Sequence, residues 1–316
     1  MNLSVVIPTY GRAKDLERLL ESLSKQELKP DEIIIVIGPN DLPTKQIVDD
    51  CQIKVPSIVA LSATKPSLVH SLNLGIAQAK GDVICLLDDD VWLPADWAKK
   101  INIAYKNDEL LGAYGGRDRI QLDVDGLMDP APAAIVGTFR WNGKLVGNHH
   151  CGCLTSPVEV DVLKGVNLSF RKKALGYQGI DSRLESKGAE ICTEIEICQR
   201  VKLAGYKVVY DNENYLLHFV AQRVGADDRN DIFTETTKNR TFNQALVMAK
   251  FRPAYQLIFH LFRTLLIGTR KEPGIIRAFL LINKAGPRVL LLPFQNFKYS
   301  MRGAFLGLNK HDLNHK

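Results

Sequence analysis

The chain has 316 residues, of which 46% are hydrophobic and 24% are charged, a composition typical of a globular protein with a large core. This composition excludes collagen-like and intrinsically disordered classes. The net charge of +6 is unevenly distributed. Residues 250–316 contain twelve Lys or Arg and two acids, a local charge of +10 that leaves −4 on the first 249 residues. A basic segment of this kind indicates an anionic partner, either a membrane or a nucleic acid.

The amino terminus, Met1-Asn2-Leu3-Ser4, has neither the basic segment nor the long apolar segment of a signal peptide, so we expect a cytoplasmic protein. In that compartment the six cysteines are predicted to be reduced thiols. The run His149-His150-Cys151-Gly152-Cys153 matches no common zinc-ligand spacing, and we assign no zinc site to it.

Strands and helices alternate from the first residues. Apolar runs predict strands, and apolar residues at helical spacing predict helices. The expected strands are residues 3–7, 33–37, 57–61, 83–87 and 110–116, and the expected helices follow Arg12 and span 67–79 and 94–107. This alternation predicts an α/β fold with a mostly parallel, Rossmann-like sheet and helices on both faces. No Gly-x-Gly-x-x-Gly follows the first strand, so the dinucleotide-binding fingerprint is missing.

The second half of the chain is less regular. Residues 117–160 are rich in Pro and Gly and predict short antiparallel strands and a loop. A strand is expected at 165–171 and a helix from Gly188 to Gly205. Two further strands are expected at 207–210 and 215–219, and His218 lies at the end of the second.

Three adjacent acids, Asp88-Asp89-Asp90, follow the apolar strand 83–87. Ligands of open α/β sheets bind at the carboxyl ends of the strands. Three neighbouring carboxylates stay ionised together only beside a cation, and oxygen ligands suit Mg²⁺ or Mn²⁺ carrying a diphosphate. The alternative interpretation is a solvated turn after a strand.

A second group of acids lies at the start of the helix from Gly188. Glu190 and Glu194 are four residues apart and share a face, whereas Glu196 does not. The helix macrodipole alone favours acids in this position, so a purely structural role stays open for each. His218 is likewise either a ligand or a structural histidine.

The order of the motifs adds information that no single motif carries. It runs Val5-Val6-Ile7-Pro8-Thr9-Tyr10-Gly11-Arg12, Leu87-Asp88-Asp89-Asp90, Gly165-Val166-Asn167-Leu168-Ser169-Phe170-Arg171, an acid before Cys198-Gln199-Arg200, and His218. This order resembles the family 2 glycosyltransferases of the GT-A fold over roughly residues 3 to 245. We therefore expect a catalytic domain at 1–245 and a helical C-terminal region at 246–316.

The resemblance implies roles for individual residues. Glu194 takes the place of the catalytic base, and Asp90 with His218 takes the place of the metal ligands. The residues implied in nucleotide-sugar binding are Pro8, Thr9, Arg12, Asn73, Asp88 and Asp89. Asn167 and Arg171 fall in the acceptor-side segment.

Three positions depart from the family pattern. Ile37 stands where the family usually has a base-reading Asp, and Asp41 is a displaced candidate. Thr193-Glu194 replaces the usual Glu-Asp. Processive synthases carry Gln-x-x-Arg-Trp after the base, but here Gly137 replaces the Gln and the Arg-Trp pair precedes Glu194. This departure favours transfer of a single sugar.

The basic C-terminal region contains apolar runs at 255–268, 278–282 and 289–294, each interrupted by a charge or a proline and too short to span a bilayer. Lys and Arg beside large apolar residues at helical spacing favour helices on an anionic membrane surface. The alternative is that these helices pack on the catalytic domain or form a homodimer. A nucleic-acid partner is not expected, because no binding motif is visible and the apolar content is high.

The sequence therefore predicts an inverting glycosyltransferase of the hexosyltransferase type, dependent on Mn²⁺ or Mg²⁺. Its donor would be a nucleotide sugar and its acceptor a glycan or lipid-linked glycan in cell-surface polysaccharide synthesis. It would act at the inner face of the cell membrane. Two alternatives stay open: a sugar-nucleotide pyrophosphorylase, and an inactive sugar- or lipid-binding relative.

Overall fold

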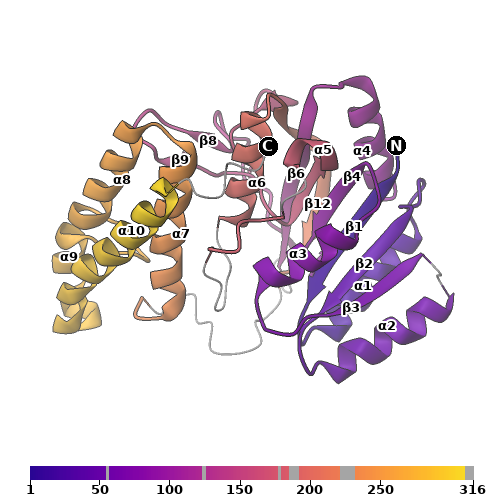
Figure 1. The fold of residues 1–316 in the computed structure, drawn as a ribbon, viewed down its shortest axis with the longest axis horizontal. Helices are drawn as coiled ribbons and strands as arrows, with labels where there is room; N and C mark the ends of the chain where they lie inside the picture. Colours follow the sequence, from indigo (N-terminus) through magenta and orange to yellow (C-terminus); the bar gives the residue numbers. More distant parts are fainter. Residues whose placement is uncertain (55–56, 123–125, 177–178, 185–191, 221–231, 310–316) are drawn as a thin grey trace. The chain divides into compact units, whose positions relative to one another are not determined.

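The computed structural model describes residues 1–54, 57–122, 126–176, 179–184, 192–220 and 232–309 (Figure 1). The chain divides into two compact units. The first comprises Met1–Thr138, Val146–Asp181 and Glu194–Val224, and the second comprises Phe139–Leu145, Ser182–Thr193 and Gly225–Lys316.

The first unit is built on a mixed sheet with the strand order β10-β12-β6-β11-β4-β1-β2-β3. These strands are β1 Leu3–Thr9, β2 Glu32–Ile37, β3 Ile58–Ser62, β4 Val83–Leu87, β6 Leu111–Leu122, β10 Val158–Glu159, β11 Asn167–Arg171 and β12 Lys207–His218. The short strands β5 (Val91–Trp92) and β7 (Gly126–Leu127) pair with β12 and β6. Strands β4, β1, β2 and β3 are parallel, as is β12 to β6, whereas β11 runs antiparallel to both β4 and β6.

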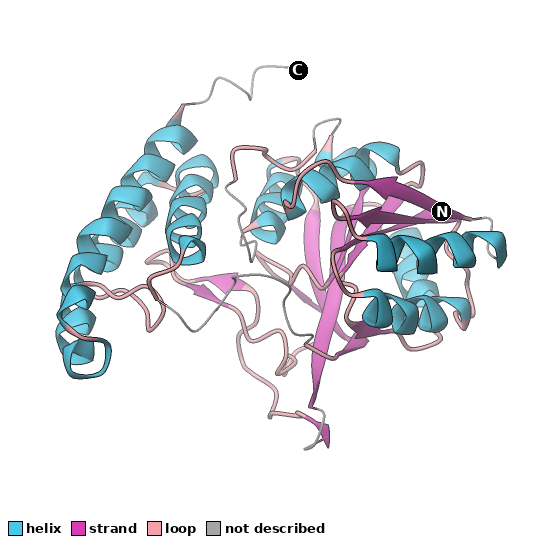
Figure 2. Ribbon diagram, turned by 90° about the horizontal axis from the view of Figure 1, so that it is seen from below, coloured by secondary structure: helices cyan, strands magenta, loops and turns pink. Residues whose placement is uncertain are grey.

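Helices cover both faces of this sheet (Figure 2). The large core of the unit joins α1 (Ala13–Ser24) and α4 (Trp97–Asn107) to the sheet residues Val5, Ile35 and Cys85. On the opposite face, α3 (Leu68–Gln78) packs so closely that a Cβ at Gly75 would collide with Val6. The predicted α/β sheet with helices on both faces is therefore confirmed, and Trp97, Ile101 and Tyr105 are buried as expected.

Three elements of this unit differ from expectation: the helix at residues 42–54 and the strands β12 and β6. Helix α2 (Leu42–Lys54) was not predicted, because its buried stripe is narrow and includes the polar Thr44 beside Val48. Strand β12 is one strand with a register shift between Asp211 and Leu216 rather than two separate strands. The remaining helices of the unit are α5 (Lys172–Leu175) and α6 (Thr193–Leu203).

Strand β6 continues past the glycine pair that was expected to end it. A Cβ at Gly116 would collide with the carbonyl oxygens of Asp211 and Asn214, so glycine allows β6 to pass the irregular part of β12. The strand therefore extends to Leu122 and carries Asp118 into the sheet.

The second unit is helical. It contains α7 (Glu235–Phe251), α8 (Ala254–Leu266), α9 (Ile275–Ala285), the 3₁₀ helix η1 (Pro287–Leu291) and α10 (Leu292–Leu308). The hairpin of β8 (Thr138–Phe139) and β9 (Leu145–Val146) contributes residues 139–145 to it. Helices lie over the three apolar runs as expected, whereas α7 was not predicted. Helix α7 is continuous across residue 245, and the domain division at 245/246 stays a prediction.

The structure shows no disulfide among the six cysteines, all of which lie in the described part of the chain. The His149–Cys153 run makes internal contacts. His149 Nε2 lies 2.9 Å from the carbonyl oxygen of Val162, and Cys151 Sγ lies 3.4 Å from His150 Nε2. Among the described residues this run provides no group of three metal ligands.

Candidate active site

The acidic run Asp88–Asp90 lies where β4 ends, at the edge of the sheet reached by the carboxyl end of the parallel β1. Backbone pairing brings His218 to the same place. His218 pairs with Val91 across β12 and β5, and the N–H of Phe219 donates to the carbonyl oxygen of Asp90 at 2.9 Å. The topology thus brings together Asp90 and His218, which are 128 positions apart in the chain.

Asp88, Asp90 and His218 form a group of potential metal ligands. One ligand atom from each lies within 4.8 Å of the others, and His218 Nε2 is 3.4 Å from Asp90 Oδ1. Two carboxylates and one imidazole are a donor set that suits Mn²⁺ and, through the oxygens, Mg²⁺. The residues present therefore fit a divalent cation.

Arg12 faces the acids from the start of α1. Its Nη1 donates to Asp89 Oδ1 at 2.8 Å and lies 3.6 Å from Asp90 Oδ2. Burial raises the pKa of Asp89 to about 6, although Arg12 and the neighbouring Thr9 lower it. Burial, followed by repulsion from Asp90, raises the pKa of Asp88 as well. This edge of the sheet therefore concentrates negative charge that needs a cation.

Two residues of the site were not found from the sequence. Asp118 on β6 is fully buried, with its Oδ2 3.7 Å from His218 Nδ1, and Lys164 Nζ forms an ion pair with the same carboxylate. Burial would raise the pKa of Asp118, but the nearby His218 and the charge of Lys164 lower it. A carboxylate behind a ligating histidine fixes the orientation of the ring.

His218 responds to the same surroundings. Burial lowers its pKa, but the contacts with Asp118 and Asp90 and the negative charges of Asp90 and Asp88 outweigh burial and raise the pKa to about 9. The sequence signal for Asp118 was its place two residues after a glycine pair in a strand. The expected strand 110–116 ends before Asp118, whereas β6 extends to Leu122.

The two acids of helix α6, Glu194 and Glu196, lie in different environments. Glu196 is fully buried, and its Oε1 accepts a hydrogen bond from Arg200 Nη2 at 2.5 Å. Glu194 is partly exposed, and its Cβ lies near Gly165, in the loop that leads into β11. Because β11 begins opposite Leu87, that loop lies at the edge of the sheet where Asp88 begins. Glu190, the third acid of this group, lies outside the described residues.

Several other predicted site residues are held by internal contacts. Asn73 Nδ2 donates to the carbonyl oxygen of Ile180 at 2.8 Å, and its Oδ1 accepts from the N–H of Ile180 at 2.6 Å. Asp41 Oδ2 accepts from the N–H of Gly11 at 2.5 Å, which ties the loop after β1 to the start of α2. Pro8 is partly exposed near the end of β1.

The acceptor-side candidates on β11 are buried in the sheet. Asn167 accepts from Trp97 Nε1 at 3.1 Å and donates to the carbonyl oxygen of Asn214 at 2.6 Å. Arg171 pairs with Val83 at the opposite end of β4 and donates to the carbonyl oxygens of Leu111 and Tyr105. The structure does not bring Arg171 together with the acids of the site.

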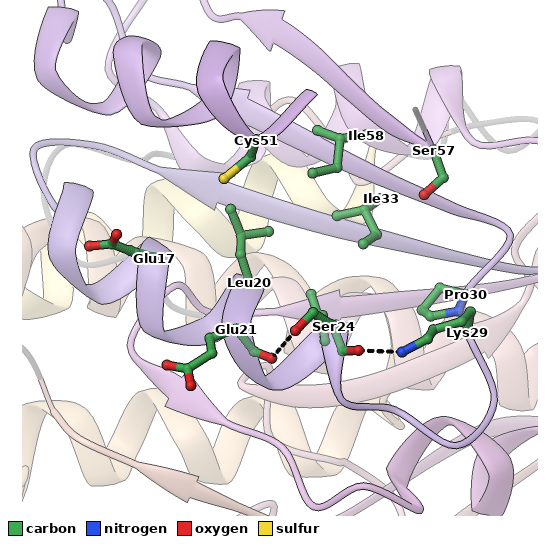
Figure 3. Close-up of a pocket in the computed structure, with 11 residues that line it drawn as sticks. Glu17, Leu20, Glu21, Ser24, Lys29, Pro30, Ile33, Cys51, Ser57 and Ile58 are labelled. Carbon is green, nitrogen blue, oxygen red and sulfur yellow. Dashed lines mark hydrogen bonds between the residues drawn. The ribbon is translucent and has the colours of Figure 1, made fainter. Parts of the chain in front are cut away.

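A separate hollow lies at the other end of the sheet (Figure 3). Its cavity of about 470 Å³ is lined mainly by apolar groups, including Leu20 of α1 and Cys51 of α2. Ile33 and Ile58 line it from the beginnings of β2 and β3, whereas the acids follow the end of β4. This cavity is therefore not part of the acidic site.

A mixed α/β sheet with such a cluster at the carboxyl edge of its parallel strands matches the GT-A fold, as the similarity to two solved structures shows. GalNAc-T7, determined with UDP, GalNAc and Mn²⁺, superposes with a TM-score of 0.65 at 15% identity, covering 83% of this chain and 50% of that protein. TarS residues 1–349 of S. aureus with UDP-GlcNAc superposes with a TM-score of 0.56 at 15% identity, covering 96% and 91%.

The family model described as Glycosyl transferase family 2 matches residues 4–164, about half of the chain. The chain belongs to this family and is a glycosyltransferase. It is 26% identical over 224 residues to a glucosyl-dolichyl phosphate glucuronosyltransferase of Haloferax volcanii, covering 69% of each protein. It is 23% identical over 223 residues to the O-antigen chain rhamnosyltransferase RfbN of Salmonella typhimurium, covering 69% of this chain and 66% of that one.

Proposed function

We propose that this enzyme transfers a single sugar from a nucleotide-sugar donor, with inversion at the anomeric carbon, in a reaction that requires Mn²⁺ or Mg²⁺. The observation that carries the proposal is the Asp88, Asp90 and His218 cluster beside Arg12 at the carboxyl edge of the sheet. Structural neighbours crystallised with UDP-GlcNAc or with UDP and Mn²⁺ support this class of donor.

Asp88, Asp90 and His218 would hold the divalent cation. When bound, the cation supplies positive charge to the diphosphate of the donor and to the departing nucleoside diphosphate. Asp118 holds the His218 ring and Lys164 neutralises Asp118, so the imidazole is oriented before a ligand arrives. Arg12 holds Asp89 and presents further positive charge on the donor side.

Glu194 is the proposed catalytic base. An inverting transfer needs a carboxylate that takes the proton of the acceptor hydroxyl as its oxygen attacks the anomeric carbon. Glu194 is partly exposed near the loop before β11, whereas Glu196 is buried in an ion pair with Arg200. The environments of the two side chains favour Glu194 for this role.

The proposed acceptor is a glycan or a lipid-linked glycan in cell-surface polysaccharide synthesis. The relatives that act on glucosyl-dolichyl phosphate and on O-antigen chains support this acceptor class. Such an acceptor would place the enzyme at the cytoplasmic face of the cell membrane, in contact with anionic lipid through its basic C-terminal region.

A donor panel tests the proposal. The full chain is incubated with UDP-, GDP- and dTDP-sugars, with Mn²⁺, with Mg²⁺ or with a chelator, and release of the nucleoside diphosphate is measured. We expect metal-dependent turnover of at least one donor and loss of the metal-dependent component in Asp90→Asn. Metal-independent turnover that Asp90→Asn retains would overturn the metal assignment. Tight donor binding without turnover would favour an inactive relative.

A further inference from the structure

Helix α8 carries its side chains in an unusual arrangement. Its buried face includes the polar residues Gln256, His260 and Thr264. Its exposed residues include large apolar side chains at helical spacing, namely Tyr255, Ile258, Phe259, Phe262 and Leu266. A helix packed on a core in water has the opposite arrangement, with its apolar stripe inside.

Helix α10 repeats this arrangement, whereas α9 shares the apolar exterior but packs Ala278 into an apolar cluster with Val289 and Leu292. The buried face of α10 contains Asn296, Ser300, Gly303 and Gly307 among other residues. The exposed large apolar residues of these two helices are Ile276, Phe279, Leu280, Phe294, Met301, Phe305 and Leu308. Ala278 is the one residue of α9 that is fully buried. All three helices thus expose large apolar side chains, and α8 and α10 also bury polar side chains.

The interior is held by close backbone approach and polar contacts. A Cβ at Gly303 would collide with the carbonyl oxygen of Phe242, and one at Gly307 with that of Leu246, so glycine at these positions lets α10 approach α7. Asn296 Nδ2 donates to the carbonyl oxygen of Pro273 at 3.3 Å, and the Ser300 hydroxyl donates to that of Thr241 at 3.4 Å. Small residues four apart and polar groups between helices are typical of helix packing in lipid.

We infer that the exposed apolar side chains of α8, α9 and α10 insert into one leaflet of a membrane that contains anionic lipid. This inference extends the membrane contact proposed above from surface attraction to insertion. Within the described part of the chain, the helices are too short or too polar to cross a bilayer. Insertion parallel to the membrane plane buries the apolar face without a crossing.

The positive charge of residues 250–316 favours anionic lipid, rather than a second copy of the chain, as the partner of the apolar surface. Residues 250–316 carry a net charge of +10, and Arg270, Lys271, Lys284, Arg288 and Lys298 are exposed. In a two-fold symmetric dimer the apolar surface of these helices would contact the same surface of the second chain. The positive charges of the two chains would then lie close together and repel each other. Anionic headgroups instead neutralise them at the level of the interface.

Trp141 belongs to the same apolar exterior. It is 69% exposed, and its ring makes an edge contact with Phe259 of α8 at a centroid distance of 5.3 Å. Tryptophan favours the boundary between lipid and water because one part of its ring system is apolar and its N–H is polar. Of the other two tryptophans, Trp97 is buried in the core of the first unit and Trp92 on β5 is only partly exposed, so Trp141 is the best fluorescent reporter of lipid contact.

The full chain is tested by sedimentation with vesicles of phosphatidylcholine alone or mixed with phosphatidylglycerol. We expect binding that requires the anionic lipid, together with quenching of Trp141 by lipids brominated in the acyl chains; Trp141→Phe removes that signal. Leu280→Gln and Phe279→Ser should each weaken partitioning by about tenfold, because each removes an inserted apolar side chain.

Leu42→Gln is the matched control, because Leu42 of the first unit is 73% exposed and Leu280 is 76% exposed. The control should bind vesicles like the unmodified chain. Binding without quenching of Trp141 would mean surface adsorption and would overturn insertion. A stable dimer in which Leu280→Gln weakens self-association would assign the face to a second copy. Nucleotide-sugar hydrolysis without vesicles reports the proposed transferase activity separately, so failure of either proposal is recognised by itself.

Discussion

In the first unit, large apolar side chains fill the space between the sheet and its helices, and charged groups gather at the carboxyl edge of the strands. In the second unit, the buried clusters are small, and Thr, Asn, Gln and His side chains lie between helices whose outer faces carry Phe, Leu and Ile. Apolar surface lies away from water when a chain folds, whether the protein core or another apolar phase receives it. This contrast is the basis of our proposal that the outer faces of the second unit lie in lipid.

The largest expected effect concerns the charged edge of the first unit. Glu194→Gln should reduce sugar transfer by roughly two to four powers of ten and leave donor binding nearly unchanged, because only the proton acceptor is lost. Steady-state transfer and calorimetric titration of the nucleotide sugar measure the two quantities.

Glu196→Gln is the matched control two residues away. It weakens the buried ion pair with Arg200, so it should lower the unfolding temperature while transfer by the folded enzyme persists. If Glu196→Gln abolishes transfer and Glu194→Gln does not, the base has been assigned to the wrong acid of α6.

Asp118→Asn tests whether the buried acid of β6 serves the metal site. The variant keeps the shape of the side chain but no longer stabilises the His218 ring through a negative charge, so the affinity for Mn²⁺ should fall by about 10- to 100-fold. Titration of Mn²⁺ followed by electron paramagnetic resonance measures this affinity without relying on turnover. Asp129→Asn is the comparison, since Asp129 is a half-exposed acid that pairs with Arg117. Equal Mn²⁺ affinity in the two variants would leave Asp118 a purely structural role.

Gly303→Ala tests the close packing of the second unit. The added Cβ meets the carbonyl oxygen of Phe242, so α10 and α7 must separate, and the free energy of unfolding should fall by about 1–3 kcal/mol. Met301→Ala is the control on the exposed side of the same helix. Chemical denaturation of both variants measures the difference, and equal stability would show that the two helices tolerate a wider spacing.

The sheet was predictable wherever burial follows a simple pattern. Strands β1, β2 and β4 contain runs of apolar residues, and α1 has a regular apolar stripe, so the presence and order of these elements followed from the residues alone. The acids after β4 were recognised from their place at the carboxyl end of an apolar strand, and the role of His218 was implied by the motif order.

The rest depended on tertiary contacts that a pattern does not contain. Asp118 was missed because the glycines that allow β6 to pass β12 are also typical of a strand end. Helix α7 was missed because Thr237, Asn239, Thr241 and Asn243 are buried in it, which inverts the pattern expected of a helix in water. The functions of Asn73 and Arg171 could not be separated from packing roles, because their internal partners lie 60 or more residues away in the chain.

The smallest expected effect concerns the polar interior of the second unit. Burial raises the pKa of Glu272 from its ordinary value of 4.5 to about 7, although Arg240, Arg263 and Lys271 lower it. Between these pH values the folded chain binds a proton that the unfolded chain releases. The contribution of Glu272 to stability is therefore fully present below about pH 4.5 and is lost as the pH rises through 7.

In Glu272→Gln this dependence is absent, so the unfolding temperature of the variant should rise relative to the unmodified chain between pH 5 and pH 8. Thermal unfolding across this range measures the difference, and Glu235→Gln, at an exposed acid of α7, serves as the control. A difference that stays constant with pH would mean that Arg240, whose Nε lies 3.3 Å from Glu272 Oε1, compensates fully for burial of the carboxylate. The interior of the second unit would then hold a charge as readily as the edge of the sheet does, and the contrast between the two units would apply only to their outer surfaces.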